Sequence, residues 1–170
     1  QLSYNENDII NSLSILELRK KLAALYKLEN DNAQEERELE EIVKLTEKLT
    51  AWNPQLYSTT YVDALGDLQS YYNNYDDVES MLKVNSMGLD AYEATKVSGY
   101  DAISKLAIII QCCSLKLLID GRNNESEKWF NNLLKIYYCL DAMKPNSVNN
   151  ELVETLSCIG HAQNWEGKFD

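Results

Sequence analysis

The residues of this chain that could do chemistry are few, and any histidine-dependent site must use His161, the single histidine. Cys158 lies three residues earlier, a spacing that puts both side chains on one face of a helix and could supply two metal ligands. The sequence has no CxxC pair and no second histidine to complete a ligand set. We therefore expect Cys158 to be a core thiol with His161 on the adjoining helix face.

A group of acidic residues, Asp76, Asp77 and Glu79, is the second candidate. It is similar to the aspartate-rich motif that binds magnesium pyrophosphate in helical prenyl-transfer enzymes. That motif needs an acid one turn after the first pair, where this chain has Ser80 and Met81. Acids at a helix start are favoured by the helix dipole, which explains the group without a ligand. No GxxxxGK[ST] or GxGxxG phosphate-binding motif occurs, and we expect no catalytic residue, metal site or cofactor.

Composition and charge limit the partners. The 170 residues suit one domain with a sizeable core, and the net charge is -11. That charge disfavours a nucleic-acid backbone or an anionic membrane surface, and it leaves a basic peptide or protein face as partner. The longest apolar stretch, about 106–119, is interrupted by Gln111, Ser114 and Lys116, so we expect no membrane span.

Cysteine usage predicts the compartment. The four cysteines lie in apolar helical patterns, which is typical of reduced thiols in a cytoplasmic or nuclear protein: Cys112, Cys113, Cys139 and Cys158. The chain starts at Gln1 with a polar stretch that lacks the pattern of a signal peptide. We expect it to be a fragment of a longer protein.

Apolar periodicity and break signals predict about seven helices. Asn32 and Asn74, each followed three residues later by an acid, are expected to cap the second and fourth of them. Two prolines and six glycines are few, as in a chain of long helices. The fifth helix is apolar on nearly every side, so we expect its neighbours to cover it and place it at the centre of the core. The expected helices cover residues 5–29, 32–52, 58–72, 75–95, 101–120, 124–143 and 147–165.

The breaks recur with a fixed period. Pro54, Gly99 and Pro145 lie 45 and 46 residues apart, which is typical of a stacked array of helical hairpins. We predict a single all-α domain over residues 1–170, a right-handed α-α superhelix of stacked antiparallel hairpins. The hairpins are expected at about 5–53, 58–97 and 100–144, followed by a half hairpin at 147–170.

The repeated residues resemble the tetratricopeptide-repeat family. Three matches carry the resemblance: Leu156, Ile159, Gly160, Gly167 and Phe169; Val62, Leu65, Gly66, Asn73, Tyr75 and Val78; and, more weakly, Ile110, Cys113, Ser114, Gly121, Ser126 and Phe130. The unit here is about 46 residues instead of 34, so the chain looks like a long-helix variant, with HEAT-type repeats as the alternative. The first glycine of a unit, Gly66 or Gly160, is expected to let the two helices of a hairpin approach closely, and the second, Gly121 or Gly167, to turn the chain with positive φ.

The resemblance implies a concave groove lined by the first helix of each hairpin. Its partner-binding positions in this sequence would be Asp63, Asp67, Tyr71, Gln111, Leu115, Leu118, Glu154, His161, Asn164 and Trp165. Carboxylates beside aromatic and apolar groups suit a basic or amphipathic partner segment. None of these positions is lysine or arginine, so we do not expect a clamp for acidic peptide ends.

The expected function is a non-catalytic protein–protein interaction scaffold that binds such a segment or packs against further repeats of its own chain. Two alternatives stay open: a helical-bundle enzyme with a divalent-metal site at Asp76 and Asp77, and a helical oligomerisation module using residues 31–52. An array that ends at the seventh helix is expected to expose Leu156, Ile159 and Trp165.

Overall fold

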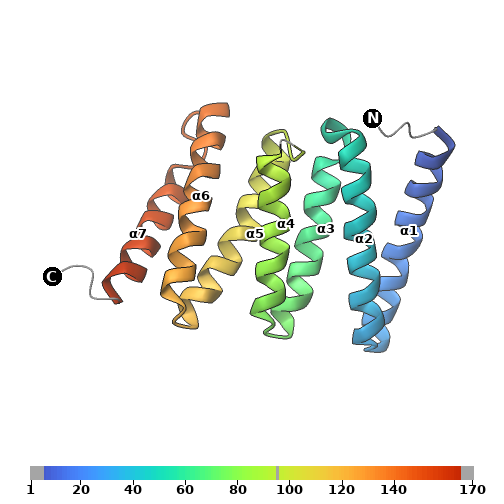
Figure 1. Cartoon of the computed structure of the whole chain (residues 1–170), viewed down its shortest axis with the longest axis horizontal. Coiled ribbons are helices and arrows are strands. Elements are labelled where there is room, and N and C mark those ends of the chain that lie inside the picture. Colours follow the sequence, from blue (N-terminus) through green and yellow to red (C-terminus); the bar gives the residue numbers. More distant parts are fainter. Residues whose placement is uncertain (1–5, 95, 166–170) are drawn as a thin grey trace.

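The computed structural model describes residues 6–94 and 96–165, with the side chains of residues 6, 7 and 165 excepted. Over these residues the chain forms seven helices and no strand, and successive helices run up and down side by side (Figure 1). This confirms the expected all-α superhelix of helical hairpins. The helices are α1 (Glu6–Glu29), α2 (Asn32–Trp52), α3 (Pro54–Asn74), α4 (Val78–Glu93), α5 (Tyr100–Ile119), α6 (Asn123–Met143) and α7 (Asn149–Trp165).

Short polar side chains begin three of the helices. Asp31 caps α2, where its carboxylate accepts a hydrogen bond from the Gln34 amide at 3.3 Å. Asp77 caps α4 in the same way, so the caps are these aspartates and not the expected Asn32 and Asn74. Asn53 caps α3, which begins at Pro54, four residues before the expected start. Proline fits the first helical position because that residue needs no amide hydrogen.

The helices pack unevenly along the array. α2 packs as extensively against α3 as against α1, and α6 packs in the same way between α5 and α7. α4 makes smaller contacts with α3 and α5. Among the first helices of the hairpins, α3 and α5 pack together, whereas α1 and α3 share at most a marginal contact. The space between α1 and α3 is therefore open to a side chain or a segment from outside the array.

The fifth helix has one open side, contrary to the expectation that neighbours cover it all round. Leu106, Ile110 and Leu117 are fully buried, but Ile108 is 57% exposed and Ile119 is 80% exposed. By length and composition α5 could cross a membrane, and half of that stretch is buried in the array. The apolar residues of α5 thus serve both the core and one exposed stripe, which consists of Ile108, Cys112, Leu115 and Ile119.

The end helices expose apolar residues because each packs on a single neighbour. On α1 only Leu16 and Ala23 are fully buried. On α7, Leu156 is exposed as predicted, but Ile159 is only 8% exposed. The prediction for Ile159 was therefore wrong, because this side chain joins the core that α7 shares with α6. The predicted exposure of Trp165 lies outside the described side chains.

A buried polar junction joins α3, α4 and α5. The Gln69 side-chain amide of α3 donates to the Ile109 carbonyl oxygen of α5 at 2.8 Å and to Asn85 Oδ1 of α4 at 3.3 Å. Gln69 and Asn85 are both buried. A hydrogen bond to a backbone carbonyl fixes the position of α3 along α5 more narrowly than apolar contact does.

The close approach of helices takes place at Gly88 of α4, a residue that the repeat match did not include. A Cβ atom at Gly88 would lie 2.6 Å from Leu106 Cδ1 and 3.4 Å from Leu65 Cδ1. At Gly66 the nearest atom would be at an ordinary 3.6 Å, and at Gly160 nothing lies within 4 Å. Close approach was expected at the two matched glycines, and neither requires it.

We predict that Gly88→Val lowers the free energy of unfolding by about 2 kcal/mol, because the added methyl groups overfill a closed core beside Leu106. Urea denaturation measures the change. Gly160→Ala is the matched control on another helix, and its free energy of unfolding should stay the same or rise by up to about 1 kcal/mol. A Gly88→Val protein as stable as the parent would show that α4 can move away from α5 freely.

Removing the buried amide tests the polar junction. Gln69→Leu should lower the free energy of unfolding by about 2 kcal/mol, because Asn85 loses its partner inside the core. The double variant Gln69→Leu with Asn85→Leu should lose less than the sum of the two single variants, since no polar group is then left unpaired. Strict additivity in the double-mutant cycle would contradict a coupled junction.

Candidate functional site

A groove of about 810 Å³ lies between α1 and α3, with α2 beneath it and α5 beside it. We call it the α1/α3 groove. It exists because α1 and α3 both pack on α2 but hardly on each other. Its lining includes Lys20, Ala23, Ala24 and Lys27 of α1, Glu35, Leu39 and Ile42 of α2, Asp63, Gly66 and Asp67 of α3, and Lys105, Ile108 and Cys112 of α5.

Small residues leave room along both long sides of the groove. Ala23 and Ala24 stand on α1 where longer side chains would fill the space, and Gly66 does the same on α3. The floor is apolar and includes Ile42 of α2, and the exposed Ile108 of α5 adds apolar surface at the side. An apolar floor with polar edges is the usual form of a site that binds a partner segment.

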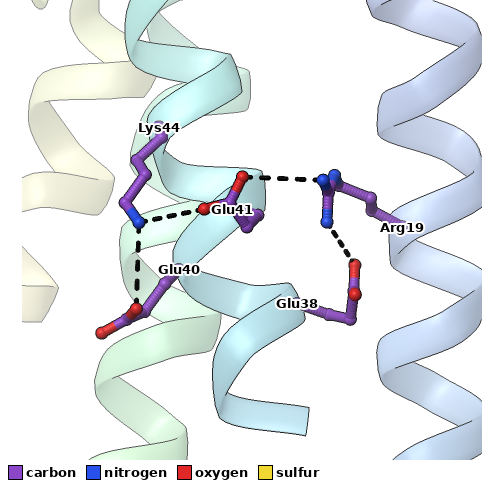
Figure 2. A network of polar contacts seen from close by, with 5 residues as sticks. All are labelled: Arg19, Glu38, Glu40, Glu41 and Lys44. Atoms are coloured by element: carbon purple, nitrogen blue, oxygen red, sulfur yellow. Dashed lines mark hydrogen bonds and ion pairs between the residues drawn. The ribbon is translucent and has the colours of Figure 1, made fainter. Parts of the chain in front are cut away.

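Ion pairs hold α1 in place on α2 (Figure 2). The Arg19 guanidinium lies 2.7 Å from the Glu38 carboxylate and 3.5 Å from that of Glu41. Lys44 then pairs with Glu41 at 3.0 Å and with Glu40 at 3.9 Å. The hydrogen bond from Lys44 also lowers the pKa of Glu41. The two Arg19 pairs join α1, the basic side of the groove, to α2 at its floor.

Carboxylates occupy the α3 side and one end of the floor. Asp63 and Asp67 stand one turn apart on α3, and Asp63 accepts a hydrogen bond from Lys105 Nζ at 2.7 Å. Although Asp67 is exposed, partial desolvation of its carboxylate inside the groove raises its pKa above the usual 3.8, and the Asp63 charge adds to this effect. Glu35 at the start of α2 is only 8% exposed, yet its carboxylate makes no hydrogen bond or ion pair with any described residue. The Glu35 side chain lines the groove, where a cationic group of an occupant would pair with it.

Lysines occupy the α1 side. Lys20 and Lys27 are seven residues apart, which puts them on one face of α1 about 10.5 Å along the axis, and both line the groove. Lys20 Nζ lies 3.5 Å from an exposed Glu17 carboxylate. Together with Lys105, the groove carries three lysines against its three carboxylates. None of these lysines was among the expected site residues, which came from later helices only.

The expected site residues of α3 all border the groove, but the side chain of Tyr71 makes contacts within the fold. Asp63 and Asp67 are exposed on its side. The buried Tyr71 donates its hydroxyl hydrogen to the Asn32 carbonyl oxygen at 2.9 Å. Its ring packs on Tyr75 at a centroid distance of 4.8 Å, and burial raises its pKa to about 12. Tyr71 therefore links α3 to the start of α2 and does not offer a free aromatic anchor.

The three expected site residues of α5 have different surroundings. Leu115 belongs to the exposed stripe that starts at Ile108 in the groove. Gln111 is turned toward α6, where its side-chain oxygen accepts a hydrogen bond from the Tyr137 hydroxyl at 3.2 Å. Leu118 is half-buried against the core. The residues of α5 that line the groove are Lys105, Ile108, Ile109 and Cys112.

The expected site residues of α7 are far from the groove. Glu154, His161 and Asn164 are exposed on the last helix, at the opposite end of the array from α1 (Figure 1). The side chain of Trp165 is not among those described. The structure therefore does not bring these positions together with Asp63 and Asp67.

Cys158 and His161, which were considered as metal ligands, differ in their exposure to solvent. Cys158 is half-buried, and burial raises the pKa of its thiol, while His161 is exposed. All four cysteines are free, with Cys113 buried and Cys112 exposed. Within the described part of the chain, no cluster of three or more histidine, cysteine or acidic side chains could hold a metal ion.

The acidic group at the start of α4 is engaged in contacts between helices. Asp76 lies 2.6 Å from Lys116 Nζ, and Asp77 caps α4. Glu79 lies 2.7 Å from the Arg122 guanidinium. These contacts tie the start of α4 to the end of α5 and the start of α6, and they account for the three acids.

We predict that Asp67→Asn raises the free energy of unfolding at pH 7. The pKa of Asp67 is higher in the folded state than its usual 3.8, so the folded state binds a proton more readily than the unfolded state does. The parent therefore loses stability relative to the variant as pH rises through the folded-state pKa. Urea unfolding between pH 4 and 7 should show a difference that is largest at pH 7. A difference independent of pH would contradict this account.

No family model matches the sequence, and the comparisons with curated proteins and with solved structures give no match either.

Proposed function

We propose that this chain is a non-catalytic scaffold module that holds an amphipathic segment of a partner protein in the α1/α3 groove. The observation that carries the proposal is an open groove of about 810 Å³ with an apolar floor and unpaired charges along its edges. Its volume falls within the range of roughly 300–1,000 Å³ that is common for ligand sites. The partner would place apolar side chains on Ile42 and Ile108 and a cationic group near Asp67 and Glu35.

The exposed stripe of α5 extends this binding surface. Ile108 and Cys112 lie in the groove, and Leu115 continues the stripe one turn further along α5. Exposed apolar residues in a continuous row are a common mark of an interaction surface. A partner segment that leaves the groove would follow this row.

The proposal agrees with what the tetratricopeptide resemblance implies. In that family the first helix of each hairpin lines the binding groove, and here α1, α3 and α5 hold those places. We propose that the chain is a long-helix relative of such repeats and acts in the cytoplasm or nucleus, where its free cysteines would stay reduced. Further repeats of the same protein could pack on the exposed faces of α1 or α7.

Specific contacts favour the scaffold over the two alternatives. The acids of the enzyme hypothesis, Asp76, Asp77 and Glu79, serve a helix cap and two ion pairs. The apolar residues of the oligomerisation hypothesis, such as Leu39 and Val43 of α2, are buried between neighbouring helices. In contrast, no segment of the described part of the chain occupies the α1/α3 groove.

A display library of helical peptides, each about 16 residues long with one apolar face, tests the proposal. Selection on the chain should enrich peptides whose affinity falls at least about tenfold in Ile108→Asp, because a buried charge would replace a central apolar contact. Fluorescence anisotropy with the purified peptides measures the affinity. Ile108 is exposed, so its substitution should leave the fold intact.

Val153→Asp is the matched control, since Val153 is 68% exposed on α7, away from the groove. It should leave peptide affinity unchanged. Peptides that bind Ile108→Asp as tightly as the parent would overturn the groove as the binding site.

A further inference from the structure

The charges of the α1/α3 groove are sorted by side. The α1 side carries Lys20 and Lys27, and the α3 side carries Asp67, with the buried Glu35 at the floor. Asp63 is neutralised by Lys105 of α5 at 2.7 Å. A segment lying in the groove thus meets positive charge along one edge and negative charge along the other.

These charges do not neutralise one another across the groove. Lys20 and Lys27 both act to lower the pKa of Asp67, so the two sides influence each other electrostatically. No ion pair joins them, however, and Lys27, Asp67 and the Glu35 carboxylate have no ion-pair partner among the described residues. Because the two sides form no ion pair with each other, both are available to an occupant.

We infer that the occupant is an amphipathic helix of mixed charge, with a cationic edge facing α3 and an anionic edge facing α1. The inference rests on the proposed function and narrows its partner chemistry. A helix that is basic along both edges would face Lys20 and Lys27 with like charge. The structure therefore favours a partner with opposite charges on its two edges over the wholly basic partner that the net charge of -11 suggests.

The spacing of the charges favours a helix over an extended segment. Lys20 and Lys27 are two helical turns apart on α1, and both act electrostatically on Asp67 of α3 across the groove. A helix laid alongside presents its edge residues at the same intervals, i, i+4 and i+7, and can match both sides at once. An extended strand repeats one face every two residues and would match one side only over a short distance.

The two-sided pattern also sets the direction of the bound helix. Reversing a helix in the groove exchanges the edges that face α1 and α3. A given charged helix would then place its cations against Lys20 and Lys27. Opposite charges on the two sides thus select one of two orientations, which a uniformly acidic groove could not do.

The test uses the same display library with its apolar face fixed and both edges randomised among lysine, glutamate and glutamine. Selection on the parent chain should enrich lysine on one edge and glutamate on the other. Selection on Lys20→Glu with Lys27→Glu should enrich lysine on both edges, because the α1 side has changed sign. Lys21→Glu, on the same helix but outside the groove lining, is the matched control and should give the parent pattern.

Peptide affinities should follow these patterns. A mixed-charge peptide should lose roughly two- to five-fold in affinity for each groove charge neutralised, by Lys27→Gln or Asp67→Asn, as is typical of exposed ion pairs. Enrichment of lysine on both edges with the parent chain, or a glutamate edge unchanged by the Lys20→Glu and Lys27→Glu reversal, would overturn this inference and leave the proposed function standing. If selection on the parent chain enriches peptides no more than selection on Ile108→Asp does, both this inference and the proposed function are overturned.

Discussion

The arrangement of the array depends on the junction where α3, α4 and α5 meet. Gln69 reaches from α3 to a backbone oxygen of α5, and Gly88 lets α4 come close enough to bury Asn85 beside it. The Asn85 amide nitrogen is buried without a hydrogen-bond partner among the described atoms, a cost that the packing around Gly88 must offset. Because α3 and α5 border the groove together, this junction also fixes the relative positions of Asp63, Lys105 and Ile108.

Other neighbouring helices are also joined by a hydrogen bond from a side chain to a backbone carbonyl oxygen. Thr50 of α2 donates to the Tyr57 carbonyl oxygen of α3 at 3.1 Å, and Ser126 of α6 donates to the Ser114 carbonyl oxygen of α5 at 2.9 Å. α1 differs, since its side-chain contacts with α2 are a short row of buried residues and the ion pairs of Arg19. Partly exposed ion pairs contribute little to stability. The basic side of the groove is therefore held less firmly than the acidic side, and it is the side that can adjust to an occupant.

The helices could be predicted from sequence because their ends are marked locally. Asn53-Pro54 and the positive-φ glycine at Gly121 stop or start a helix through their own backbone preferences, and the structure places breaks at both. Cap residues were misplaced by one to three positions where two short polar residues compete, as at Asp31 and Asn32. Local signals determine where a helix ends, but they carry little information about which face it presents to its neighbours.

The groove was only partly predictable for the same reason. Asp63 and Asp67 were found because the repeat resemblance assigns binding positions to the first helix of a hairpin, and α3 does border the groove. The apolar residues of α1 are spread around the helix, so its sequence alone could not show that Lys20 and Lys27 face α3. On α5, Gln111 and Cys112 are adjacent, and the turn of about 100° between them moves a side chain from the α6 contact to the groove.

Net charge and local charge have different roles in partner recognition. The net charge of -11 is not concentrated in the groove, where three lysines balance three carboxylates. Acids such as Glu36, Glu40 and Glu47 instead lie on other faces of α2. Long-range attraction depends on the whole charge distribution and would speed the approach of any basic partner. Short-range pairing in the groove decides which segment stays bound and in which direction, so a partner can be basic overall and still need an acidic edge on the helix that it inserts.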